Sequence, residues 1–186
     1  MVKYTLTRCS TLIQVSDLKR YIRDIPDYPV KGVIFRDLTP MFKDPLIFSA
    51  VIDDLYMKLR EFKLDKVAGV EARGFIVGSP LAIKLGIGFI PLRKAGKLPW
   101  SKKKITYDLE YGQESLEVHT DAIKRGERIA IVDDLLATGG TAAAAAKLLE
   151  SIGGRTEVIA FVVSLNYLKG KEKLSKYRVI TLVDYD

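Results

Sequence analysis

The chain has 186 residues, 48% of them hydrophobic and 28% charged, which suits one globular domain large enough to bury a core. No apolar run approaches the ~20 residues that a membrane-spanning helix needs, and no signal-like segment opens the chain, so we expect a cytoplasmic protein without a membrane partner. The net charge of +7 favours anionic partners, such as nucleic acid or a phosphorylated small molecule. The single cysteine, Cys9, cannot form an internal disulfide, which agrees with a reducing compartment.

The N-terminal part of the chain predicts two helices. Apolar side chains recur at helical spacing after Ser16, which predicts a helix over residues 16–25. Residues 44–62 predict a second helix, with Asp44 as its N-cap and a proline at the first helical position. Residues 1–15 show no clean period. We therefore expect them to form an extension in front of a single domain that covers residues 16–186.

The rest of the sequence alternates strands with helices. Aliphatic runs predict strands within residues 66–74, 86–93, 128–134, 156–165 and 177–183, and helices within residues 74–86 and 141–154. We expect Gly86 to end the first of these helices and Pro80 to lie in its first turns or to kink it. Residues 105–119 alternate around a glycine, which predicts a hairpin-like excursion. This order argues for an α/β fold with a parallel sheet covered on both faces.

Residues 129–150, IAIVDDLLATGGTAAAAAKLLE, carry the clearest chemical pattern. Ligands of an open parallel sheet bind beyond the carboxyl ends of its strands, and Asp133 and Asp134 would lie at the carboxyl end of such a strand. A helix that begins near the second threonine offers free N–H groups to a phosphate, so we predict a phosphate site in the loop of Ala137, Thr138, Gly139, Gly140 and Thr141. The two acids would repel that phosphate but suit hydroxyl donors or a metal. A phosphate beside a vicinal diol describes a ribose 5-phosphate.

Two familiar nucleotide-binding loops are missing from this sequence. Neither G-x-x-x-x-G-K-[ST] nor G-x-G-x-x-G occurs. A simpler interpretation of the stretch is an acidic strand end followed by an ordinary glycine turn, and an isolated acid pair or glycine turn would favour it. The complete order of strand, acid pair, loop and helix favours the binding site instead.

Several longer motifs occur in one order along the chain: DIPDYPVKGVIFRDLTPMFKDP, GVEARGFIVGSPLAIKLGIGFIPLRKAGKLP, YDLEYGQESLEVHTDAI and VDDLLATGGT. The last resembles the 5-phosphoribosyl-1-pyrophosphate (PRPP) signature of the type I phosphoribosyltransferases, and the wider match is to the members that use adenine. The resemblance implies that family's fold, with a mainly parallel central sheet, a small N-terminal hood segment and a mobile lid hairpin at about residues 101–118. It also implies a purine-salvage transferase that gives AMP and pyrophosphate from adenine and PRPP.

A departing pyrophosphate carries several negative charges, so its site needs cations and backbone donors where that charge gathers. The candidates are Arg73, in the EARG turn that lies against pyrophosphate in the family, and Arg93, Lys94 and Lys97 after the next strand. A solvated basic rim is the simpler explanation of these four residues. We favour the functional interpretation because the cations follow the carboxyl ends of neighbouring strands.

Loss of pyrophosphate leaves an oxocarbenium-like ribose that water would capture, so a lid that excludes water is expected. By resemblance, Glu110 helps to manage the proton on the incoming adenine, Tyr111 helps to close the lid, and Arg73 completes the catalytic set. A surface aromatic packed on its loop remains the alternative for Tyr111.

Adenine recognition is implied for the segment Ile34, Phe35 and Arg36, whose main-chain groups read the base edge in the family. Phe35 matches the position that stacks on one face of the base, and Leu135 would pack on the other. A core aromatic beneath the N-terminal segment is an equally good interpretation of Phe35. The specificity for adenine therefore rests on the resemblance.

The resemblance also implies Mg²⁺ bound mainly through PRPP, with no direct protein ligand assigned, and a homodimer. Two rival functions stay open. One is the same reaction with hypoxanthine, guanine, xanthine or orotate, against which the VIFRD and LEYG segments argue. The other is a regulatory protein that senses PRPP and binds nucleic acid, which the net charge permits. No aromatic stretch interleaved with basic residues supports nucleic-acid binding.

Overall fold

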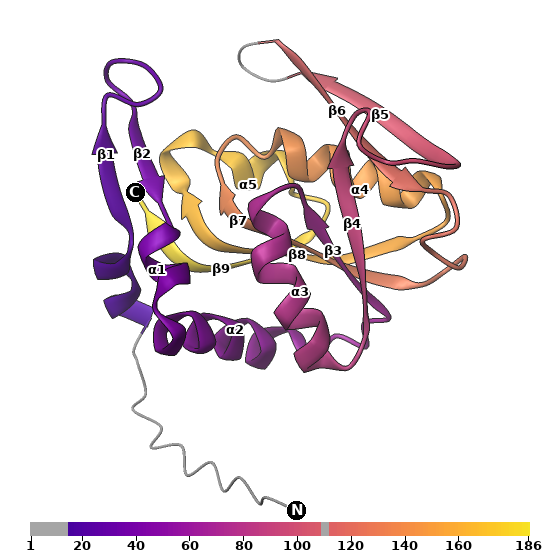
Figure 1. Ribbon diagram of the computed structural model, residues 1–186, viewed down its shortest axis with the longest axis horizontal. Helices are drawn as coiled ribbons and strands as arrows, with labels where there is room; N and C mark the ends of the chain where they lie inside the picture. The colour runs from indigo at the N-terminus through magenta and orange to yellow at the C-terminus, as the bar shows by residue number, and fades with distance from the viewer. Residues whose placement is uncertain (1–14, 109–111) are drawn as a thin grey trace, which may run out of the picture. The chain divides into compact units, whose positions relative to one another are not determined.

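The computed structural model describes residues 15–108 and 112–186 (Figure 1). Its contacts divide the chain into two compact units, Met1–Phe48 and Ser49–Asp186. The extension predicted for residues 1–15 lies almost wholly outside the described residues. The single domain predicted for residues 16–186 stays a prediction.

The first unit contains a small antiparallel ribbon. A 3₁₀ helix, η1 (Val15–Tyr21), leads into β1 (Arg23–Pro26), which pairs with β2 (Ile34–Asp37) before the short helix α1 (Thr39–Lys43). The helix predicted over residues 16–25 is therefore wrong at its end, because Ile25 lies in β1 opposite Phe35. Ile25 precedes a proline, and the proline ring disfavours helical backbone at the residue before it.

The second long helix agrees with its prediction. Helix α2 (Pro45–Leu59) begins with the expected proline and continues across the boundary between the two units. The Asp44 Oδ1 atom accepts hydrogen bonds from the backbone N–H groups of Leu46 (2.9 Å) and Ile47 (3.1 Å). These bonds satisfy two of the free donors at the helix start, so Asp44 is the N-cap.

The second unit is built on one seven-stranded sheet with the order β5-β6-β4-β3-β7-β8-β9. Five strands are parallel, and β5 and β6 continue the sheet as an antiparallel hairpin beside β4. The bounds are β3 (Lys66–Val70), β4 (Gly88–Lys94), β5 (Lys102–Asp108), β6 (Gln113–His119), β7 (Arg128–Leu136), β8 (Arg155–Leu165) and β9 (Arg178–Tyr185). The mainly parallel sheet and the hairpin were both predicted.

Two crossover helices cover opposite faces of this sheet (Figure 1). Helix α3 (Arg73–Leu85) joins β3 to β4, and α4 (Gly140–Ser151) joins β7 to β8. The two connections run in opposite directions along the sheet, and right-handed crossovers then place their helices on opposite faces. The central strands are consequently buried on both sides, which explains their uninterrupted aliphatic sequences.

Helix α3 ends as predicted but contains its proline differently. Gly86 caps the helix in the left-handed conformation, at a φ of 71°, where a glycine carries no steric cost. Of the two alternatives expected for Pro80, a place in the first turns is excluded because the proline lies inside the helix, and a kink there stays a prediction.

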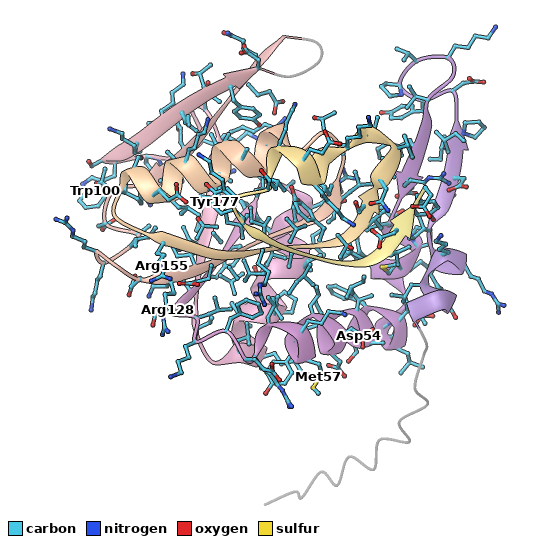
Figure 2. All side chains as sticks on the ribbon, turned by 180° about the vertical axis from the view of Figure 1, so that it is seen from behind. Asp54, Met57, Trp100, Arg128, Arg155 and Tyr177 are labelled. Atoms are coloured by element: carbon cyan, nitrogen blue, oxygen red, sulfur yellow. The ribbon has the colours of Figure 1, made fainter. Side chains whose placement is uncertain are left out.

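The amino-terminal ends of the parallel strands carry basic side chains. Arg128 and Arg155 begin β7 and β8 and pair in register (Figure 2). Each is neutralised locally, since Arg128 contacts Asp65 and Arg155 contacts Glu157. Part of the net positive charge therefore lies in local ion pairs. No helix within residues 15–108 and 112–186 is long and apolar enough to cross a membrane.

Candidate active site

A cavity of the second unit lies between two strand connections that run in opposite directions along the sheet. Strand β3 continues through α3 to β4 on one side, and β7 continues through α4 to β8 on the other. A cavity of roughly 290 Å³ opens at the carboxyl ends of β3 and β7, lined by Val70–Arg73, by residues 133–142, and by Lys94, Glu114 and Phe161. In open α/β sheets this crevice between diverging connections is the usual position of a ligand.

The paired acids lie within β7, which continues two residues past them to Leu136. On one side β7 pairs with β3 only as far as Val132, whereas on the other it pairs with β8 as far as Leu136. The strand therefore projects beyond its neighbour, and the cavity lies along the projecting segment. Asp133 and Asp134 line this cavity, as the sequence predicted.

The two carboxyl groups are closely linked. The Asp134 backbone N–H donates to Asp133 Oδ1 at 3.0 Å, and the Arg73 Nε lies 2.9 Å from Asp134 Oδ2. Burial raises the pKa of Asp133 well above its usual value, and the Asp134 charge raises it further. Burial also raises the pKa of Asp134, although the Arg73 guanidinium opposes this shift. Asp134 is only 3% exposed. The ionised pair therefore lowers the free energy of unfolding at neutral pH.

The predicted phosphate loop follows directly and lines the same cavity. Gly139 has a φ of 78° and precedes α4, which begins at Gly140. The loop also packs against α5 (Gly170–Lys173), because a Cβ on Gly139 would lie 2.5 Å from the Gly170 carbonyl oxygen. This contact allows only glycine at position 139, and a Cβ on Gly170 would overlap the Ala137 carbonyl oxygen. Backbone N–H groups at the start of α4 thus face the cavity without a side-chain cap.

Glycine also brings α3 close to the acids. A Cβ on Gly74 would lie 2.8 Å from the Val132 carbonyl oxygen and 2.9 Å from Asp133 Oδ1. The absence of a side chain there lets the first turn of α3 lie against β7. Arg73, at the start of the same helix, is thereby brought within reach of Asp134.

Each of the four predicted pyrophosphate cations lies beside a carboxylate. Arg73 contacts Asp134, and Lys94 Nζ lies 2.7 Å from Glu114 Oε1. Glu71 receives the other two, with Lys97 Nζ at 2.6 Å from Oε1 and Arg93 Nε at 3.2 Å from Oε2. Arg73 and Lys94 line the cavity, whereas the lining residues do not include Arg93 or Lys97.

Sequence reasoning missed the acids of this arrangement and one tyrosine. Glu71 and Glu114 line the cavity, and the Tyr107 hydroxyl lies 3.1 Å from Glu114 Oε2 and 3.3 Å from Thr141 Oγ1. Glu71 carried a usable signal, because it directly follows a buried strand, at the end of the sheet where ligands bind. Glu114 and Tyr107 carried none, since their contacts depend on how the hairpin meets α4.

Comparison with known proteins places this arrangement in a family. The phosphoribosyl transferase domain family matches residues 41–185. The adenine phosphoribosyltransferase of Carboxydothermus hydrogenoformans is 50% identical over 169 residues, which cover 91% of this chain and 99% of the relative. This chain belongs to the adenine phosphoribosyltransferase family.

Solved structures of this family agree with the fold. The enzyme from Thermoanaerobacter pseudethanolicus has a TM-score of 0.90 and 49% identity, with 92% of this chain and all of that chain covered. The enzyme from Saccharomyces cerevisiae has a TM-score of 0.87 and 42% identity, with coverage of 90% and 97%. The type I phosphoribosyltransferase fold expected from the sequence is therefore confirmed.

Of the remaining residues implied by the resemblance, Leu135 alone belongs to the described lining of the cavity. Glu110 and Tyr111 fall outside the described residues, between β5 and β6. Ile34, Phe35 and Arg36 lie in β2 of the first unit. There Phe35 meets the Tyr28 ring edge-on at 5.3 Å, and Arg36 forms an ion pair with Asp24. Leu135 lines the cavity of the second unit.

The single histidine has a structural position. His119 Nε2 lies 2.9 Å from the Pro99 carbonyl oxygen, and its ring meets the Trp100 ring edge-on. Trp100 itself is exposed (Figure 2). Within the described part of the chain, no group of three or more His, Cys, Asp or Glu side chains could hold a metal ion.

Proposed function

We propose that the protein transfers ribose 5-phosphate from PRPP to adenine and gives AMP and pyrophosphate. Its family supports this reaction, and the relative from yeast was crystallised with adenine and an imino-altritol bisphosphate. The observation that carries the proposal is the cavity in which an acid pair and a glycine loop meet at the end of β7. This combination suits a sugar phosphate, since the carboxylates accept hydrogen bonds from hydroxyl groups and the backbone N–H groups of the loop donate hydrogen bonds to a phosphate.

The ribose 5-phosphate lies along the projecting end of β7. Asp133 and Asp134 accept hydrogen bonds from the 2- and 3-hydroxyl groups, and the phosphate occupies the loop from Ala137 to Thr141. These contacts hold C1 of the ribose toward the cations around Glu71. Holding the sugar at both ends orients C1 for attack by the base.

Pyrophosphate leaves toward the basic side of the cavity. Arg73 and Lys94 line that side, and Arg93 and Lys97 lie behind it on Glu71. Preorganised cations stabilise negative charge as the bond from C1 to oxygen breaks. Arg73 also stays close to the acid pair, so it joins the ribose subsite to the leaving-group subsite.

The resemblance assigns the edge of adenine to main-chain groups of Ile34, Phe35 and Arg36, and its two faces to Phe35 and Leu135. The contact of Phe35 with Tyr28 keeps the packing interpretation of this aromatic open. The amide and carbonyl groups of an exposed segment can separate a 6-amino from a 6-oxo purine, because donor and acceptor exchange places.

Magnesium fits the donors present when it is held through the substrate. Mg²⁺ prefers oxygen ligands and is commonly bound by one or two carboxylates together with phosphate oxygens. Asp133 and Asp134 supply hard oxygens, and the buried Asp134 Oδ2 faces the Arg73 Nε at 2.9 Å without an aligned hydrogen bond. The ion would neutralise charge on the pyrophosphate group, while the protein's own cations orient it.

A homodimer in a reducing cytoplasm completes the proposal. Ile76 and Ile83 lie seven residues apart on α3 and are 42% and 82% exposed, which gives one face of the helix an apolar surface. A lone cysteine suits a reducing compartment.

One assay tests the reaction. The protein is incubated with PRPP, Mg²⁺ and each nucleobase in turn, and the nucleotide product is measured by chromatography. We expect AMP from adenine and at least a hundredfold less product from hypoxanthine, guanine, xanthine or orotate. Turnover of another base alone would assign the rival reaction. Salt-sensitive binding to RNA or DNA without turnover would assign the regulatory function.

Glu110→Ala should lower kcat by about a hundredfold or more while the KM for PRPP changes by less than about threefold, since loss of a general acid–base group costs typically ~10²–10⁴-fold. Steady-state kinetics with PRPP varied at saturating adenine measures both constants. A rise in KM at unchanged kcat would remove the proton-handling role from Glu110.

A further inference from the structure

Glu71 occupies an unusual position for an acid, because it lies among the cations of the proposed pyrophosphate subsite. Its side chain is 9% exposed and follows the last residue of β3. It accepts hydrogen bonds from Lys97 Nζ at 2.6 Å, from Arg93 Nε at 3.2 Å and from the Lys94 backbone N–H at 3.0 Å. It therefore takes donors from three of the four residues assigned to the leaving group.

The carboxyl group stays charged under all working conditions. Burial alone would raise its pKa, but the hydrogen bonds from Lys97, Arg93 and the Lys94 N–H outweigh burial and lower the pKa to about 2. At neutral pH a negative charge thus lies in the lining of the cavity, two residues before Arg73 in the sequence.

Two anions cannot use one set of donors independently. Every hydrogen bond that Lys97 or Arg93 redirects to pyrophosphate weakens its contact with Glu71, and the two negative charges also repel each other. A site built only for tight binding would carry cations without this partner. Tight binding of a product, however, slows its release and limits turnover.

We propose that Glu71 is an internal competitor for the leaving group: a positioning residue that holds Arg93 and Lys97 in place but weakens the affinity of the site for pyrophosphate. This inference rests on the proposed function, since it takes the basic side of the cavity as the pyrophosphate subsite. Glu71 acts through the cations and needs no contact with the reacting atoms.

Glu71→Gln tests the competition directly. Glutamine keeps the shape and one acceptor oxygen but removes the charge, so Lys97 and Arg93 turn more readily to the product. Calorimetry with inorganic pyrophosphate at fixed Mg²⁺ should give a Kd about tenfold lower than that of the unmodified protein, which is ~1.4 kcal/mol of binding free energy. Product inhibition of AMP formation by pyrophosphate should strengthen by the same factor.

Glu71→Ala should change the affinity in the same direction, because competition depends on the negative charge rather than on the acceptor oxygen. Glu157→Gln is the matched control, since Glu157 pairs with Arg155 at the opposite edge of the sheet and should leave pyrophosphate binding unchanged. Melting curves establish that each variant is folded.

The outcomes separate the inference from the proposed function. Pyrophosphate binding that is unchanged or weaker in both Glu71 variants overturns the competition and leaves Glu71 an orienting group alone. If the unmodified protein forms AMP, the proposed function stands whichever way Glu71 behaves. If it neither forms AMP nor binds pyrophosphate, the proposed function itself fails.

Discussion

Asp133→Asn should make the protein more stable at neutral pH and at the same time a much poorer user of PRPP. The asparagine Oδ1 can still accept the Asp134 N–H, so the local backbone is retained. The variant loses a buried charge beside a second carboxylate, and we expect a gain of about 1 kcal/mol in unfolding free energy. The KM for PRPP should rise by about tenfold to a hundredfold, because the ribose hydroxyls lose a charged acceptor.

The pH dependence gives this prediction its sign. The pKa of Asp133 is raised in the folded protein, so the folded protein binds a proton at this carboxyl group more strongly than the unfolded chain does. The stabilising contribution of this group is full below its unfolded pKa, about 4, and is lost as the pH rises through its folded pKa. The stability gain of the variant should therefore be present at pH 7.5 and vanish as the pH approaches about 4.

Thermal unfolding at several pH values measures the gain, and steady-state kinetics measures the KM. Asp121→Asn removes an exposed carboxylate elsewhere and should change neither quantity. A destabilised Asp133→Asn at neutral pH would contradict the electrostatic cost assigned to the acid pair, and an unchanged KM would contradict its contact with the ribose.

Gly170→Ala should impair phosphate binding from outside the cavity. A Cβ at this position would overlap the Ala137 carbonyl oxygen and lie 3.0 Å from Leu136 Cδ1, so the loop must move. Displacement of a binding group by ~1 Å can cost a factor of 10² in turnover, and we expect the KM for PRPP to rise by about that factor. Stability should fall by about 1–3 kcal/mol, the cost of overpacking.

Gly88→Ala is the matched control for this variant. At Gly88 the added Cβ would meet only the flexible Lys66 side chain, at 3.1 Å, on the far side of the sheet. The kinetics with PRPP should be unchanged there. Normal use of PRPP by Gly170→Ala would show that the loop tolerates movement and does not need its support from α5.

Local sequence order was enough to predict the parts of the site that are contiguous in the chain. The acid pair, the glycine loop and the start of α4 follow one another within a dozen residues, and a strand, a turn and a helix N-terminus each have their own residue preferences. The Asp44 cap and the Gly86 helix end could be predicted for the same reason.

Contacts that depend on tertiary pairing could not be predicted. Glu71 meets Arg93 and Lys94 because β3 and β4 are neighbours in a particular register, and Glu114 meets Lys94 through the pairing of β6 with β4. Nothing in the local sequence shows that Gly170 touches Ala137, thirty-odd residues earlier. The end of the first helix was mistaken because a strand partner and a following proline outweighed helical spacing at Ile25.

The place of β3 in the sheet has a consequence for how the protein folds. On one side Lys66 pairs with Gly88, close along the chain, but on the other it pairs with Ile129, much farther away. Closing the longer loop costs more chain entropy, so strands β3–β4 and β7–β9 should assemble as separate halves before they join. Pulsed hydrogen exchange during refolding would then protect the amides that join β7 to β3 last. The active site would form only when β3 pairs with β7. A refolding chain would therefore gain secondary structure well before it gains activity.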